Sequence, residues 1–232
     1  MKKKTLAAVL ALLVFFGSGM SIQVSAELYQ PADKSQAIQW AIDMFMIAGF
    51  RPEYGDDARD YMVRWENPIR IFISGDYTDE DKAALEKIVQ QLNERVLWLP
   101  DVSMAKKVKL ANVTITMAKL EELIDYESNY LAGNWGWFSY WYDDYKINRA
   151  NIVIASDVTS QRERNHLILE ELIGALGLAN DITEFSDSII TQEWTTVQQL
   201  NSLDWYMLNM LYDSSMHPGM TKKEAKKILT GK

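Results

Sequence analysis

The chain has 232 residues, a net charge of −8 from 24 basic and 32 acidic side chains, and no cysteine. Without cysteine it has no disulfide framework, no thiolate nucleophile and no thiolate metal ligand. The negative charge disfavours nucleic acid as a partner, because the phosphate backbone repels an acidic surface.

The first 26 residues have the pattern of a secretory signal peptide. Three lysines follow Met1, an apolar run covers 6–16, and small residues surround a cleavage site after Ala26. The run is shorter than the roughly 20 apolar residues that a membrane-spanning helix needs. We therefore expect a secreted or periplasmic mature protein, residues 27–232, with no stable membrane anchor. Cleavage removes three lysines and no acidic residue, so the net charge of the mature protein would be −11.

The first half of the mature chain alternates between helix and strand signals. Asp33 is a predicted helix cap, and Gly49 ends that helix. Apolar and polar residues then alternate from Ile69, which predicts a strand that ends at Gly75. Thr78 caps a second predicted helix, in which apolar residues repeat at helical spacing as far as Val96. Alternation over 108–117 predicts another strand, and a short helix is expected over 120–124.

The stretch 126–145 is unusually aromatic. Its eight aromatic side chains are Tyr130, Trp135, Trp137, Phe138, Tyr140, Trp141, Tyr142 and Tyr145. One interpretation is a β-hairpin or edge strand that packs one aromatic face inward, since aromatic residues favour strands and bury large areas. The other is a solvent-facing platform for a sugar or a peptide, formed by Trp135, Trp137 and Trp141. A further strand is predicted over 147–155.

The segment 160–180 combines helix signals with ionisable side chains. Ser160 and Glu163 form a capping box, apolar residues recur at helical spacing, and Gly177 is suited to a left-handed stop. Residues four apart lie on one stripe of a helix, so His166, Glu170 and Gly174 are aligned. An irregular loop over 181–194, a helix over 196–213 and a short helix capped by Thr221 complete the chain. This order predicts one α/β domain.

The run 170–180, EELIGALGLAN, aligns with the zinc-protease helix pattern HExxHxxGxxH. Glu171 stands at the general base, and Gly177 stands at the turn glycine. The three histidine positions hold Glu170, Gly174 and Asn180, which are not a set of zinc ligands.

Together with this run, the pieces ALGLAND, DSI and PGMT in order resemble domain of unknown function 2927, a family of bacterial exported proteins. The resemblance implies a zincin-like fold, in which a small twisted mixed sheet packs on an active-site-type helix and a C-terminal helix. It places Asp187, Ser188 and Ile189 at the turn beneath the metal of zinc proteases. Gly177, Asn180 and Ser188 are then expected to be structural.

Three functional interpretations remain open. The first is a non-catalytic scaffold that binds a protein, a peptide or a cell-envelope glycan and needs no cofactor. The second is an atypical metal hydrolase, in which His166 and Glu170 bind zinc or another divalent ion, Asp181 or Asp187 completes the site, and Glu171 polarises water. The third is glycosidase-type chemistry between Glu171 and one of the same aspartates, beside the tryptophans. Against the metal site, His166 and His217 each have the character of a surface histidine.

The signal-peptide pattern predicts that the exported protein starts at Glu27 and is recovered as soluble protein outside the cytoplasmic membrane. Intact-mass spectrometry of the exported product, after separation of membrane and soluble fractions, checks this. A product that retains Met1, or one that sediments with membranes, would contradict the prediction.

Overall fold

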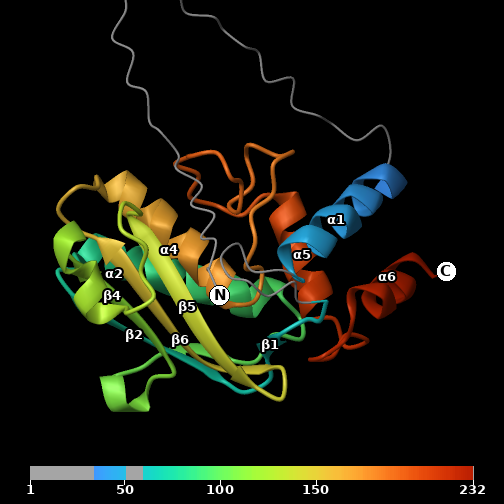
Figure 1. The fold of residues 1–232 in the computed structure, drawn as a ribbon, viewed down its shortest axis with the longest axis horizontal. Coiled ribbons are helices and arrows are strands. Elements are labelled where there is room, and N and C mark those ends of the chain that lie inside the picture. The colour runs from blue at the N-terminus through green and yellow to red at the C-terminus, as the bar shows by residue number, and fades with distance from the viewer. Residues whose placement is uncertain (1–33, 51–59, 232) are drawn as a thin grey trace, which may run out of the picture.

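The computed structural model describes residues 34–50 and 60–231, and their arrangement is shown in Figure 1. The predicted signal peptide and the predicted cap at Asp33 lie outside the described residues. Within them, no helix combines the length and the apolar character needed to cross a membrane.

Helices and strands alternate along the chain. The α-helices are α1 (Lys34–Ala48), α2 (Asp79–Arg95), α3 (Leu123–Tyr126), α4 (Gln161–Ala175), α5 (Ser202–Leu211) and α6 (Lys222–Thr230). The strands are β1 (Arg64–Trp65), β2 (Ile69–Gly75), β3 (Val102–Met104), β4 (Val113–Ala118), β5 (Gly136–Asp143) and β6 (Lys146–Ala155). Short 3₁₀ turns occur at Val108–Leu110 and Leu120–Glu122. The α/β fold class predicted from the sequence is confirmed.

The strands form one mixed sheet in the order β1-β6-β4-β2-β3, with β5 paired to β6. Every pairing is parallel except that of β5, which runs antiparallel to β6 and forms a hairpin with it. The hairpin turn contains Asp144 and Tyr145, both with positive φ. Of the two interpretations of the aromatic stretch, the β-hairpin agrees with the observed backbone, because β5 pairs with β6.

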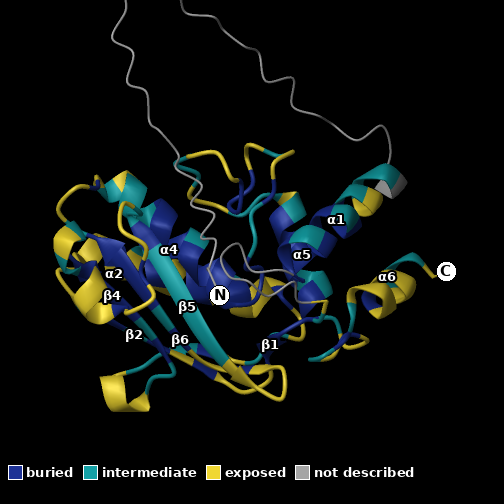
Figure 2. Cartoon of the chain, in the orientation of Figure 1, coloured by how far each residue is buried: buried dark blue, intermediate teal, exposed yellow. Residues whose placement is uncertain are grey.

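The helices form two groups in Figure 1. The helix α4 packs on β5 and β6 and also contacts α2, while α1, α5 and α6 gather on the other side of the view. Figure 2 shows that α4 is mostly buried, whereas the outer surfaces of α2 and α6 are exposed. The strand β6 is buried along its second half because it lies between β4 and β5.

A buried ion pair joins the first turns of α2 and α4. Asp81 is fully buried, and Arg164 Nε lies 3.1 Å from its carboxylate. Gln161 donates a hydrogen bond to the same carboxylate and accepts one from the guanidinium of Arg164. Asp81 also completes the capping box of α2 with Thr78. Because removal of one partner from such a pair leaves a buried charge without compensation, the network fixes how the two helices are aligned.

Two predicted boundaries were wrong. The strand predicted over 108–117 begins only at Val113, because residues 108–110 form a separate 3₁₀ turn and the side chain of Asn112 binds the backbone of Arg70 and Pro68. The helix predicted over 196–213 covers only 202–211, because Asn201 forms a capping box with Asp204 that sets its first turn. The predicted capping boxes at Ser160 and Thr221 are confirmed.

Candidate functional site

The helix α4 is enclosed by protein over most of its length. From His166 to Ala179 every residue is buried except Glu170, which is partly exposed. The carbonyl groups at its C-terminal end lack helical partners, and buried side chains supply them: Trp65 Nε1 donates to Ala175 O at 3.0 Å, and Tyr212 Oη donates to Leu176 O at 2.8 Å. Burial raises the pKa of Tyr212, which keeps this donor protonated.

His166 is held at both ring nitrogens. Nδ1 lies 2.6 Å from the carbonyl oxygen of Val197, and Nε2 lies 3.2 Å from the carboxylate of Glu170. Both partners are acceptors, so the imidazolium form satisfies both contacts. Burial lowers the pKa of His166, but the hydrogen bond and charge of Glu170, with the Val197 carbonyl, outweigh it and raise the pKa above 6.5. The expectation of a surface histidine was wrong: the side chain is only 2% exposed.

The reason is a cover segment, residues 181–200, which lies over the N-terminal half of α4. Trp194 places its ring edge-on to His166, with centroids 5.5 Å apart, and makes a similar contact with Trp135 at 5.3 Å. Arg162 donates to Thr196, and Asn165 donates to Gln198. These contacts join α4 to the cover segment. Sequence periodicity could not predict that the cover segment packs on this helix.

Glu171, the candidate general base, is buried beside the first residue of β5. A β-carbon added at Gly136 would collide with the Glu171 carboxylate and would also crowd Leu167. Glycine at 136 is therefore what allows the strand to approach this carboxylate so closely. Glu170 points away from this contact, toward His166.

One turn further along α4, Gly174 faces an aromatic ring. A β-carbon added at Gly174 would collide with the ring of Phe138, which comes from β5. The position that corresponds to the second histidine of the zinc-protease pattern therefore has neither a side chain nor space for one while Phe138 holds this place.

In the first half of the cover segment, Ser188 is anchored by a buried carboxylate. Its hydroxyl donates to Asp204 at 2.5 Å, and the backbone amides of Ile189 and Asn201 donate to the other carboxylate oxygen. Burial raises the pKa of Asp204 to about 6, and these hydrogen bonds limit the rise. Asp187 is exposed, and its charge adds to the rise.

The other predicted site residues are dispersed. Gly177 has φ +120°, and a β-carbon there would crowd the carbonyl oxygen of Val63. Asn180 donates to Ile47 O at 3.5 Å, and Asp181 is half-buried at the start of the cover segment.

The three tryptophans do not form one wall. Trp135 contacts the cover segment through Trp194, while Trp137 packs edge-on to Tyr130. Trp141 lies against the guanidinium of Arg149, which is 3.8 Å from its ring centroid. All three are partly buried, so a continuous sugar-binding platform on this strand is not what the structure presents.

No group of three or more His, Asp or Glu side chains that could hold a metal ion occurs within 34–50 and 60–231. The structure adds two residues that sequence reasoning missed, Phe138 and Asp204. For Asp204 a signal existed, because Asn201 and Asp204 have capping-box spacing. For Phe138 none did, because its contact with Gly174 joins different elements.

A sequence model described as "Protein of unknown function (DUF2927)" matches residues 39–231. No curated protein matches the chain.

Solved structures similar to this one include two of myroilysin and one of a fish enzyme. One myroilysin structure is 12% identical, with a TM-score of 0.41, and the match covers 66% of this chain and 97% of that one. The other is 11% identical, with a TM-score of 0.43 and coverages of 72% and 91%. High choriolytic enzyme 1, a hatching enzyme zinc-protease from the medaka Oryzias latipes, is 12% identical, with a TM-score of 0.36 and coverages of 65% and 94%. Superpositions this loose carry no inference about the chemistry of this chain.

The contact between Gly174 and Phe138 predicts an unusual response to Gly174→Ala. Alanine is favoured over glycine in a helix by about 1 kcal/mol, yet overpacking against the ring should lower the free energy of unfolding by about 1 to 3 kcal/mol. Denaturant titration measures this. In a double-mutant cycle, Phe138→Leu should relieve part of the loss. Additive effects, or a Gly174→Ala protein more stable than the parent, would contradict the contact.

The raised pKa of Asp204 predicts a pH-dependent contribution to stability. Between its ordinary value of 3.8 and about 6, the folded protein holds a proton that the unfolded chain has released. This contribution is complete at acidic pH below that window and is lost as the pH rises through about 6.

The free energy of unfolding, measured relative to an Asp204→Asn variant at each pH, should therefore fall by about 2 kcal/mol from pH 4 to pH 7. The variant serves as the reference because the titration of His166 and other groups is common to both proteins. A difference that is constant over this range would refute the assignment to Asp204.

Proposed function

We propose, on the premise that this chain belongs to the DUF2927 family of proteins of unknown function, that it is an exported binding protein without peptidase activity. The helix α4 is a zincin-type helix that has become a packing element. It supports the sheet on one side and the cover segment on the other. The signal-peptide pattern supports export.

The contact between Gly174 and Phe138 carries this proposal. Catalytic zinc needs three protein ligands and one open position for water. In the zinc-protease helix two of those ligands are side chains one turn apart, which here are positions 170 and 174. Position 174 has no side chain, and the ring of Phe138 takes the space that one would need.

The surroundings of His166 support the same conclusion. Each ring nitrogen already faces an acceptor, so a metal ion would have to displace either Glu170 or the carbonyl of Val197. Metal ligation also requires a neutral imidazole, whereas the raised pKa of His166 favours the protonated form. The pair therefore serves better as a link between α4 and the cover segment than as half of a metal site.

Metal analysis of the mature chain, prepared without a histidine tag, tests the proposal. We expect no stoichiometric zinc, manganese or iron by plasma emission spectrometry, and no cleavage of casein or of a fluorogenic peptide library with zinc added. Glu171→Gln should behave as the parent does in both assays, because no chemistry depends on this carboxylate.

The chain contains two histidines, so a matched control is available. About one equivalent of metal that is lost in His166→Ala and kept in His217→Ala would overturn the proposal and favour an atypical metal hydrolase. Peptide cleavage that disappears in Glu171→Gln would overturn it as well and would assign Glu171 as the general base.

A further inference from the structure

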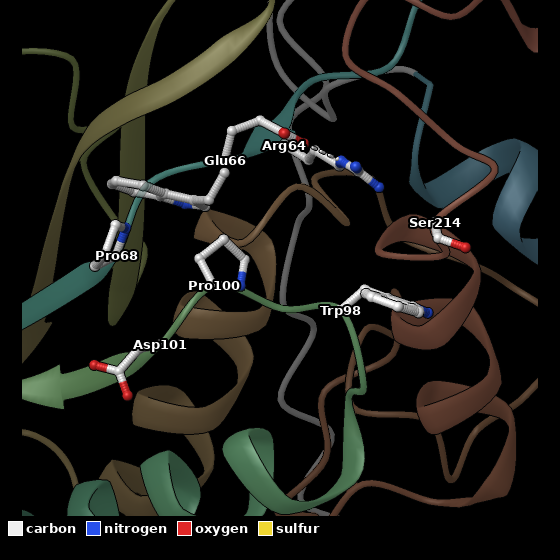
Figure 3. Close-up of a pocket in the computed structure, with 8 residues that line it drawn as sticks. Arg64, Glu66, Pro68, Trp98, Pro100, Asp101 and Ser214 are labelled. Atoms are coloured by element: carbon white, nitrogen blue, oxygen red, sulfur yellow. Dashed lines mark hydrogen bonds and ion pairs between the residues drawn. The ribbon is translucent and has the colours of Figure 1, made fainter.

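A cavity of about 430 Å³ lies away from the candidate site, at the end of the sheet where β2 and β3 begin. Figure 3 shows its walls, which come from three distant segments: Arg64 and Glu66 around β1, Trp98 to Asp101 between α2 and β3, and Ser214 after α5. Its volume falls within the range of about 300 to 1,000 Å³ that is usual for small-molecule sites.

One wall is an exposed aromatic ring in a fixed turn. Trp98 is 57% exposed although indole is a large apolar group. The turn that carries it is held by backbone hydrogen bonds from Val96 to Leu92 and from Leu99 to Val96, and Pro100 follows. An exposed tryptophan on a hydrogen-bonded turn beside a cavity provides a flat surface on which a ligand can stack.

The opposite wall contains a preorganised guanidinium. Arg64 is 8% exposed, its Nε donates to Glu66 at 2.7 Å, and its Nη1 donates to the carbonyl oxygens of Leu211 and Asp213 at 2.9 and 3.1 Å. No residue in the described part of the chain accepts a hydrogen bond from Nη2. In Figure 3 the guanidinium extends toward the side of the cavity where Ser214 and Trp98 lie.

The charges of these walls narrow the chemistry of a ligand. The guanidinium of Arg64 is paired with the carboxylate of Glu66, so these two groups together carry no net charge and provide both donors and acceptors, while Figure 3 shows the carboxylate of Asp101 pointing away from them. An anionic ligand would meet the carboxylate of Glu66, and a cationic ligand would meet Arg64. A neutral ring with an apolar face and several hydroxyl groups can stack on Trp98 and bond to both charged groups.

We propose that this cavity binds a neutral sugar ring of an oligosaccharide, stacked on Trp98 and hydrogen-bonded to Arg64 and Glu66. This site is distinct from the face of α4, so the inference goes beyond the proposed function and does not depend on whether the chain holds a metal. Such a ligand agrees with the glycan class of partner that the sequence left open, but at a site that Trp135, Trp137 and Trp141 do not line.

Isothermal titration calorimetry of the full mature chain with chitotetraose, cellotetraose and maltotetraose tests the proposal. We expect at least one of them to bind and Trp98→Ala to weaken that binding about tenfold, because the stacking surface is lost. Glu66→Ala should weaken it as well. Leu97→Ala is the matched control: its side chain is 79% exposed in the same turn but does not line the cavity, and it should leave the affinity unchanged.

Three results would overturn the inference: no binding of any neutral tetrasaccharide at millimolar concentration, equal binding by the parent and Trp98→Ala, or binding of the cationic glucosamine tetramer alone. Thermal unfolding of each variant shows whether its fold is intact. If metal is found on the chain while neutral sugar binds at Trp98, the proposed function fails and this inference stands.

Discussion

The structure depends on how the polar groups at the end of a buried helix are satisfied. The helix α4 is enclosed by protein, so its last carbonyl groups have no water to bond with, and each one left without a donor would be costly. Trp65 from β1 and Tyr212 from the end of α5 provide the donors. These two hydrogen bonds fasten the central helix to the first strand and to the C-terminal part of the chain, which are far apart in sequence.

The cover segment is held to this framework at both ends by polar contacts in apolar surroundings. Ser188 and Asp204 fix its first half to the start of α5, and His166 holds Val197 near its end. In a dry environment such contacts define a single geometry, because a shifted arrangement would leave a carboxylate or an imidazole without partners. The segment can therefore be irregular in backbone and still have a definite position.

Local signals predicted much of the fold. Helix caps and helical spacing identified α2, α4 and α6, alternation identified β2 and β4, and a run of consecutive apolar residues identified β6. The strands β1 and β3 were not predicted, because segments of two or three residues are too short to show a periodicity. They are strands because β6 pairs with β1 and β2 pairs with β3. Within the site, residue spacing predicted that His166, Glu170 and Gly174 lie on one face of α4. The burial of His166 could not be predicted in this way, because it depends on Trp194 and Val197. The lack of space beside Gly174 likewise depends on Phe138. Contacts between distant segments leave no pattern in a single sequence.

The contact between Gly174 and Phe138 also constrains how sequences of this fold can change over time. A histidine at position 174 of α4 would collide with the ring of Phe138 on β5, so a lineage would accept it most easily after residue 138 had become smaller. That earlier change would open a cavity beside α4 and lower stability without any immediate benefit. Each single change is therefore disfavoured. Chains with glycine at position 174 and chains with a metal-binding histidine at that position are thus separated by an epistatic barrier. Random substitution alone will rarely convert one kind of chain into the other.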